Sequence, residues 1–83
     1  MQYPVKLAQL TETMEEATIL KWHKSVGDHV AKKETLYEVE TDKMTMEVES
    51  IDEGYLCEIM VNEGATAKVG DVVARLADTM DEC

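Results

Sequence analysis

The chain has 83 residues, of which 18 are Asp or Glu and 8 are Lys or Arg, so its formal charge is −10. A chain of this length forms one small domain with a thin core, which leaves little room for a deep, dry catalytic pocket. The size therefore favours a binding, carrier or scaffold module over a self-contained enzyme. The negative charge argues against nucleic acids and anionic membranes as partners, because binding to either relies on Lys and Arg side chains.

The sequence indicates no membrane span, secretory signal or metal site. No apolar run approaches the roughly 20 residues that cross a bilayer, and residues 1–4 lack the basic stretch that begins a signal peptide. Cys57 and Cys83 have no partner cysteine at short spacing, and His23 and His29 match no common zinc pattern. The two cysteines are expected to be free thiols in a reducing compartment, since a bridge would tie a mobile tail to the body of the domain.

In chain order, several runs combine apolar alternation with flanking turn residues, which is typical of short strands. These runs are residues 3–7, 18–26, 36–41, 44–51, 55–61 and 72–76. In the second run, Leu20, Trp22 and Val26 are predicted on one face, with Trp22 in the core. Residues 13–16 could form a helix capping box, but poor helix formers follow, so a loop with at most a short turn is predicted. This pattern predicts an all-β sandwich or barrel.

The sequence also contains a possible internal repeat. A shift of 37 residues brings Gly27 onto Gly64. The same shift superposes apolar positions: Ile19 on Leu56, Trp22 on Ile59, Leu36 on Val73, and Val39 on Leu76. Chance alignment of two amphipathic segments is the alternative, and the matched glycines favour a repeat. The repeat predicts two similar halves that pack face to face about a pseudo-twofold axis.

Only Asp42 and Lys43 separate two alternating runs, which predicts a tight hairpin with Lys43 projecting from its tip into water. Residues 34–53 contain eight acidic residues and one basic residue, Lys43, and so carry a net charge of −7 out of the −10. Met44 and Met46 are expected to pack beneath the hairpin. An Asp-Lys turn is by itself most simply a solvated surface turn. The alternative is that the lysine is presented to another protein for modification.

The sequence resembles the lipoyl domains of the dihydrolipoyl acyltransferase subunits of 2-oxo acid dehydrogenase complexes. The resemblance covers residues 5–76 and centres on Glu38-Val39-Glu40-Thr41-Asp42-Lys43, in which the lysine of the lipoylation motif falls on Lys43. Other segments match family motifs in the same order: residues 14–22, 26–30, 61–64 and 69–74. Family members commonly have glycine in place of Ala17 and Lys33, and both replacements are predicted to lie in loops.

Biotin carrier domains share the fold and are the alternative. Their modified lysine usually lies between two methionines, and here Met44 follows Lys43 where lipoyl domains usually have alanine. Asp42 precedes the lysine instead of methionine, and this favours a lipoyl domain. An acyl carrier protein is set aside because neither Ser25 nor Ser50 lies in an Asp-Ser-Leu motif. A β-sandwich interaction module with an ordinary Lys43 remains open.

The resemblance implies an all-β, flattened β-sandwich (a barrel-sandwich hybrid) of two similar four-stranded halves. Residues 1–77 would form this carrier domain, and residues 78–83 a polar tail or the start of a linker. Lipoate, or biotin in the alternative of a biotin carboxyl carrier domain of a biotin-dependent carboxylase, would be attached through an amide to Lys43. The lipoylated lysine would act as a swinging arm that carries acyl groups and reducing equivalents, and the domain itself would have no catalytic residues.

The resemblance also implies the partners. They are a thiamine-diphosphate-dependent 2-oxo acid decarboxylase, an acyltransferase domain, a dihydrolipoyl dehydrogenase, and a lipoate ligase or lipoyl transferase. The residues predicted to contribute to recognition by the partners or the ligase are Glu40, Thr41, Asp42, Met44 and Glu47. The isolated domain is expected to be monomeric, and to be located in the cytoplasm of a bacterium or the mitochondrial matrix of a eukaryote.

Overall fold

The strands predicted from the sequence are present in the structure, with small differences at their ends. The computed structural model describes residues 1–41 and 44–83, and these form eight strands and one short 3-10 turn. The elements are β1 (Gln2–Lys6), β2 (Glu16–Trp22), β3 (His29–Val30), β4 (Thr35–Glu40), β5 (Thr45–Glu49), β6 (Gly54–Ile59), β7 (Thr66–Lys68), β8 (Val72–Ala77) and η1 (Met80–Glu82). β3 and β7 were not among the predicted runs, because two or three residues are too few to display an alternation.

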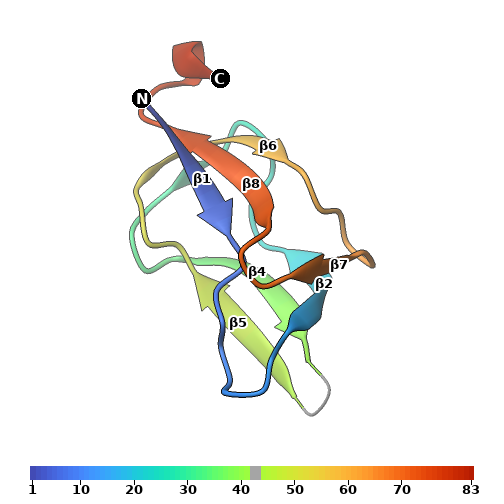
Figure 1. Ribbon diagram of the computed structural model, residues 1–83. Coiled ribbons are helices and arrows are strands. Elements are labelled where there is room, and N and C mark those ends of the chain that lie inside the picture. The colour runs from blue at the N-terminus through green and yellow to red at the C-terminus, as the bar shows by residue number, and fades with distance from the viewer. Residues whose placement is uncertain (42–43) are drawn as a thin grey trace.

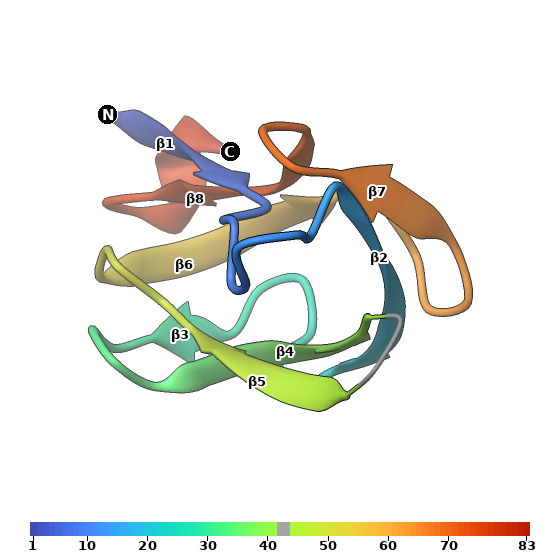
Figure 2. The same ribbon diagram turned by 60° about the horizontal axis from the view of Figure 1, so that its bottom comes forward.

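The strands form two antiparallel sheets that stack as layers (Figure 2). One sheet has the order β1-β8-β6-β3 and the other the order β5-β4-β2-β7. Exchanging the sheets replaces β1 by β5, β8 by β4, β6 by β2, and β3 by β7, so the two have the same topology. This arrangement confirms the predicted flattened sandwich of two similar four-stranded halves with pseudo-twofold symmetry.

The pseudo-twofold relation extends to single backbone hydrogen bonds. The amide of Gly27 donates to the carbonyl of Leu56 at 2.8 Å, and the amide of Gly64 donates to the carbonyl of Ile19 at 2.7 Å. One contact becomes the other when the halves are exchanged. Both glycines have positive φ, 98° for Gly27 and 89° for Gly64, a conformation that strains other residues. The matched glycines are therefore needed by two equivalent turns that join each half to the other.

One predicted strand face is wrong, because a β-bulge interrupts β2. The alternation placed Leu20, Trp22 and Val26 on one face. In the pairing of β2 with β4, however, the register passes from Ile19 directly to Lys21, so Leu20 is an extra residue and the alternation changes phase. Ile19 is consequently fully buried, whereas Leu20 is 40% exposed and Val26, beyond the end of the strand, is 57% exposed.

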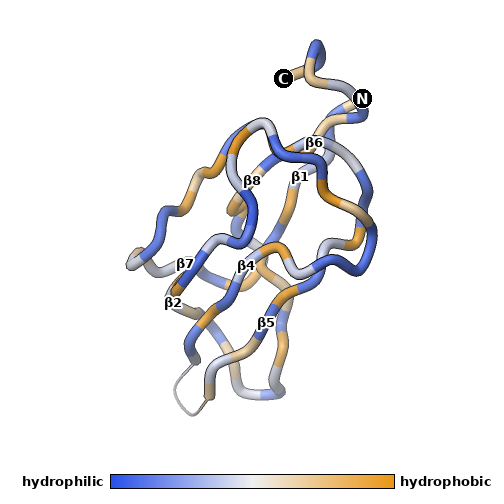
Figure 3. Tube along the Cα trace, turned by 180° about the vertical axis from the view of Figure 1, so that it is seen from behind, coloured by the Kyte–Doolittle hydropathy of each residue, from blue (hydrophilic) through white to orange (hydrophobic). Residues whose placement is uncertain are grey.

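The core lies between the two sheets and draws side chains from both. Apolar and polar residues alternate along the strands, as Figure 3 shows. The largest fully buried side chains are Tyr37, Leu7, Ile19, Leu36, Leu56, Leu76, Val30, Val39 and Val73. Trp22 packs against this cluster, as predicted. Its indole N–H donates to the carbonyl of Val61 at 2.9 Å, and its ring centroid is 4.8 Å from that of Tyr37.

Tyr37 makes the stability of the domain sensitive to alkaline pH. Burial raises the pKa of its phenol from 10.0 to about 12. The unfolded state therefore loses this proton at lower pH than the folded state, so the contribution to stability is complete below pH 10 and is lost as the pH rises toward 12. We expect the free energy of unfolding to fall by about 3 kcal/mol across that interval. Urea titrations at successive pH values measure it.

The matched control for this prediction is Tyr37→Phe. Among the residues that the structure describes, the Tyr37 hydroxyl has no hydrogen-bond partner, so its removal should cost little stability at pH 7. The phenylalanine variant should show a much smaller alkaline decline, whereas Tyr55→Phe should retain it. An alkaline decline of unchanged size in Tyr37→Phe would contradict the assignment to Tyr37.

The positions at which the family commonly has glycine differ in environment. The prediction that Ala17 lies in a loop is wrong. Ala17 lies in β2, where it is buried and pairs with Ala67 of β7. Lys33 does lie in a turn, and its φ of 69° is positive. Gly70 occupies the equivalent position of the other half with a φ of 93°. This turn therefore requires a conformation that glycine adopts more readily than lysine.

The two cysteines form a disulfide, so the expectation of free thiols is wrong. Cys57 of β6 and Cys83 are joined, and their Cα atoms are 5.1 Å apart. The expectation rested on a mobile tail, but the chain continues after β8 into η1, which brings Cys83 to β6. The two termini lie together at one end of the molecule, and the ends of β4 and β5 that flank residues 42–43 lie at the other (Figure 1). The boundary after residue 77 remains a prediction.

Candidate functional site

The predicted hairpin is formed by β4 and β5. The strands pair with Val39 opposite Met46 and Glu40 opposite Thr45. Beyond the strands, the amide of Thr41 donates to the carbonyl of Met44 at 2.8 Å, and the Thr41 hydroxyl is 3.1 Å from the same oxygen. The hydrogen bonding between the two arms of the hairpin thus continues to Thr41 and Met44, the last described residues before and after positions 42–43. Asp42 and Lys43, the predicted site residues between them, lie outside the described residues.

Alternation along β5 directs its side chains to two environments. Met46 and Val48 point inward and pack against the core, whereas Thr45, Glu47 and Glu49 are exposed on the outer face. Met44 was expected to pack beneath the hairpin, but it precedes the strand and is 50% exposed. Its thioether therefore contributes apolar surface next to the predicted site instead of core packing.

The outer face of the sheet beside this hairpin is acidic. Glu38 lies directly opposite Glu47 in the β4–β5 pairing, and Glu40 is exposed one step nearer to the end of the hairpin. Like charges that face each other across a strand pair destabilise it. The imidazole Nε2 of His23 contacts the Glu38 carboxylate and offsets this repulsion on one side when it is protonated. Of the predicted recognition residues, the structure therefore brings Glu40 and Glu47 together on one exposed surface.

A loop that sequence reasoning did not connect with the site lies beside the hairpin. Residues 7–15 join β1 to β2 and run next to the ends of β4 and β5 (Figure 1). A hollow of about 390 Å³ lies between the loop and the hairpin, and it is lined by Thr11, Thr13, Met14, Glu15, Glu16, Thr41 and Met44. Met14 anchors the loop because its side chain is buried in the core. Only the tertiary fold brings this loop to the hairpin, so no local sequence signal could have found it.

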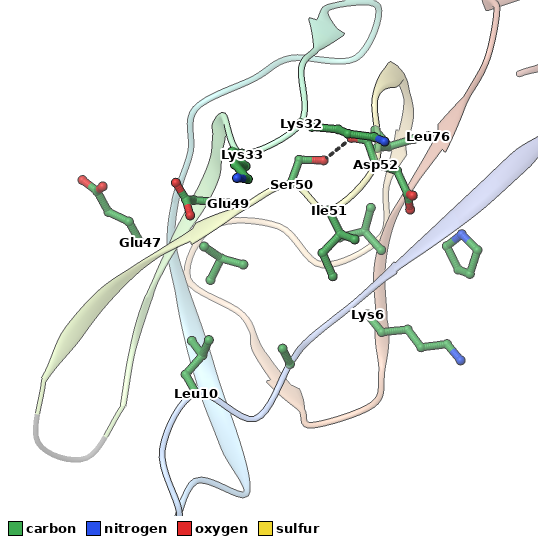
Figure 4. Close-up of a pocket in the computed structure, with 14 residues that line it drawn as sticks. Lys6, Leu10, Lys32, Lys33, Glu47, Glu49, Ser50, Ile51, Asp52 and Leu76 are labelled. Carbon is green, nitrogen blue, oxygen red and sulfur yellow. Dashed lines mark hydrogen bonds between the residues drawn. The ribbon is translucent and has the colours of Figure 1, made fainter.

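A second, larger groove of about 530 Å³ lies between β1 and β5, the edge strands of the two sheets (Figure 4). Its apolar surface includes Val5, Leu10 and Ile51, and the Ser50 hydroxyl at its rim donates to the carbonyl of Asp52 at 2.6 Å. Its charged residues are three lysines and three carboxylates, namely Lys6, Lys32, Lys33, Glu47, Glu49 and Asp52. Because these charges balance, the groove has no net charge that would select a charged ligand.

The described residues contain neither a metal site nor a membrane-spanning helix. Within residues 1–41 and 44–83, no three His, Cys, Asp or Glu side chains are grouped so that they could hold a metal ion. In the same part of the chain, no helix is long and apolar enough to cross a membrane.

Comparison with known proteins places this fold and this hairpin in a family. The family model described as "Biotin-requiring enzyme" matches residues 3–76. An acetyltransferase component of the chloroplastic pyruvate dehydrogenase complex of Arabidopsis thaliana is 49% identical over 73 residues, which are 88% of this chain and 16% of that protein. The succinyltransferase component of the 2-oxoglutarate dehydrogenase complex of Staphylococcus saprophyticus is 47% identical over 70 residues, which are 84% of this chain and 16% of that protein.

Solved structures agree with the sequence comparison. The lipoyl domain of the 2-oxoglutarate dehydrogenase complex from Azotobacter vinelandii superposes with a TM-score of 0.73 at 33% identity, covering 92% of this chain and 96% of that domain. Urea carboxylase from Kluyveromyces lactis has a TM-score of 0.76 at 22% identity over 93% of this chain and 6% of that protein, and so shows the fold alone. The chain spans about a sixth of the length of the two acyltransferases that it matches. The chain therefore belongs to the biotin/lipoyl family and, within it, to the lipoyl domains of dihydrolipoyllysine acyltransferases.

Proposed function

We propose that this chain is a lipoyl carrier domain and that lipoate is attached through an amide to Lys43. The observation that carries the proposal is the β4–β5 hairpin, which is held together at Thr41 and Met44 directly on either side of Asp42 and Lys43. The first three residues of the motif, Glu38 to Glu40, lie in β4, which ends at the end of the molecule remote from both termini (Figure 1). Because the chain belongs to the lipoyl domains, the lysine at the end of this motif is the proposed point of lipoate attachment.

The residues beside the proposed site fit an attached group that visits other proteins. Glu40, Met44 and Thr45 are all exposed, so the described neighbours leave the end of the hairpin open to a partner. A lysine amine forms a stable amide with a carboxylic acid and supplies a long flexible stem. The lipoyl group, when attached, supplies a dithiolane that accepts an acyl group and reducing equivalents. The domain contributes presentation and recognition, and the reactivity belongs to the cofactor.

In this proposal the domain is a substrate of other enzymes and performs no catalysis itself. Its partners are a thiamine-diphosphate-dependent 2-oxo acid decarboxylase, an acyltransferase domain, a dihydrolipoyl dehydrogenase and a lipoylating enzyme. The names of the relatives support complexes that act on pyruvate or 2-oxoglutarate. The domain would work in the compartment of its complex, which would be the cytoplasm in a bacterium, or the mitochondrial matrix or the chloroplast in a eukaryote, as the names of two relatives from Arabidopsis thaliana suggest.

Co-expression with a lipoate ligase or with a biotin ligase, followed by intact mass measurement, tests the proposal. We expect a single lipoyl adduct with the first enzyme and no adduct with the second. A biotin adduct would instead identify a biotin carboxyl carrier domain, the alternative that Met44 after Lys43 favours. An unmodified chain in both experiments would identify an interaction module and reject both carrier functions.

The acidic outer face is predicted to help the decarboxylase discriminate this domain. Glu40→Gln and Glu47→Gln should each reduce kcat/KM for reductive acylation by roughly 3- to 10-fold at low salt, because each removes one exposed charge from the surface beside Lys43. The reduction should shrink at high ionic strength, where the wild-type charges are screened. Steady-state kinetics with the lipoylated domain as the varied substrate measure both effects.

Asp81→Asn is the matched control for these charge variants. Asp81 is an exposed carboxylate in η1, at the opposite end of the molecule, so its removal changes the net charge equally without touching the acidic face. It should leave kcat/KM unchanged. Equal reductions in all three variants would mean that the decarboxylase responds to net charge and not to the acidic face.

A further inference from the structure

The Cys57–Cys83 disulfide lies outside the core, where a thiol reagent can reach it without disturbing the core. Cys57 is the extra residue of a β-bulge, since the pairing of β6 with β8 passes from Leu56 directly to Glu58. Leu20 has the equivalent place in the other half, and its side chain is turned away from the core. Cys57 is half-buried and Cys83 is exposed, and neither belongs to the buried cluster. The bulge thus places a thiol on the outside of a strand whose inward side chains form the core.

The other contacts of the residues after β8 are solvent-exposed. The Tyr3 hydroxyl donates to Asp78 at 2.7 Å, and the Asp78 amide donates to the carbonyl of Met1 at 3.1 Å. The amino group of Met1 pairs with Asp78 and Glu82. Exposed ion pairs contribute little and are weakened by salt. The Gln2 side-chain amide also donates to the carbonyl of Glu82. The disulfide is therefore the one covalent link between residues 78–83 and the sandwich within the described chain, beside exposed hydrogen bonds and ion pairs.

The core and the two sheets of the sandwich are complete without this link. The buried cluster runs from Leu7 to Leu76 and ends before residue 78, and no side chain of η1 is buried. Both sheets are complete without the residues that follow β8. Opening the disulfide should therefore release the segment after β8 and leave the two sheets in place.

We propose that Cys57 and Cys83 form a redox-responsive clasp that holds residues 78–83 against β6 when oxidised and frees them when reduced. In a compartment with a thiol pool, a disulfide of this accessibility is typically regulatory, whereas buried structural bridges are slow to exchange. The clasp lies at the opposite end of the molecule from the ends of β4 and β5 (Figure 1). It would thus control whether residues 78–83 lie against β6 without altering the hairpin, and it does not depend on the proposed carrier function.

The exchange requires a small dithiol as reductant and glutathione disulfide as oxidant. A thiolate of the dithiol attacks the Sγ of Cys83, the more exposed of the two residues. The bond to Cys57 breaks, and the Cys57 sulfur leaves as a thiolate that takes up a proton. The second thiol of the reagent then displaces Cys83, so the reagent becomes a cyclic disulfide and both cysteines become thiols. In the reverse direction, two electrons and two protons pass from the cysteines to glutathione disulfide, which yields two molecules of glutathione.

Thiol counting and backbone dynamics on the 83-residue chain test the clasp. The oxidised chain should take up no N-ethylmaleimide, the chain reduced with dithiothreitol should take up two, and glutathione disulfide should restore the first state. Order parameters of the amides of residues 79–83 should fall from about 0.8 to below about 0.6 on reduction, while those of β2 and β4 stay unchanged. The midpoint of thermal unfolding should fall by at least about 10 °C, because a closed loop is lost from the unfolded chain.

Single variants separate the disulfide from the polar contacts. Cys57→Ser and Cys83→Ser should both have a mobile segment that dithiothreitol no longer affects. Asp78→Asn, which weakens the contacts with Tyr3 and Met1 but retains both cysteines, should keep an ordered segment in the oxidised state. The clasp is rejected if the oxidised chain takes up two alkyl groups, if residues 79–83 are equally mobile in both states, or if reduction also mobilises β2 and β4.

Discussion

Replacement of Lys43 by arginine is expected to abolish lipoylation completely. A guanidinium stays protonated at every relevant pH and offers no free amine for amide formation. The positive charge is retained, so the net charge of −10 and the balance of charge around the hairpin do not change. Intact mass after co-expression with a lipoate ligase should show only unmodified chain, and turnover by the decarboxylase should fall to background.

Lys32→Arg is the matched control for this variant. Lys32 is an exposed lysine in a turn between β3 and β4, two strands that belong to different sheets and do not pair with each other. This variant should be lipoylated as fully as the wild type. Thermal unfolding of both variants checks that the substitutions leave the fold intact. A lipoyl adduct that persists in Lys43→Arg, or that disappears in Lys32→Arg, would move the site of attachment away from Lys43.

Gly54→Ala is expected to destabilise the domain by about 2–4 kcal/mol. Gly54 begins β6 and is buried where β6 meets the end of β8. A Cβ atom at this position would lie 2.5 Å from the carbonyl oxygen of Ala77 and 3.2 Å from its carbonyl carbon. These are backbone atoms of a strand paired on both sides, so relief requires the ladder to shift. Equilibrium unfolding in urea measures the loss.

The turn glycines provide the comparison for Gly54→Ala. A Cβ atom at Gly64 would meet nothing within 4 Å, but its φ of 89° is positive. Gly64→Ala should therefore lose only about 1–2 kcal/mol, the cost of a left-handed backbone for an ordinary residue. If the two variants lose equal stability, or Gly64→Ala loses more, close packing at Gly54 is not the dominant constraint.

Local sequence patterns were sufficient to predict those structural features that depend only on neighbouring residues. The alternation from Thr45 to Glu49 predicted a strand with one inward and one outward face, because side chains in a strand point to opposite sides in turn. Gly27 and Gly64 predicted the repeat, because each turn needs a positive φ that glycine adopts without strain. Positions that depend on a partner strand were not predictable in this way, as Leu20 shows: its exposure follows from a bulge defined only by pairing with β4.

The sequence by itself therefore determined the all-β class, the two halves, the hairpin that flanks Asp42 and Lys43, and the family motif that ends in Lys43. These features are encoded in alternation, turn residues and a short motif, all of which act over a few neighbouring positions. The tertiary structure alone decided that the loop before β2 lies beside the hairpin, that Met44 is half-exposed, and that Cys83 reaches Cys57. Each of these depends on residues far apart in the chain that the folding of the two sheets brings together. A local sequence pattern contains no information about such contacts.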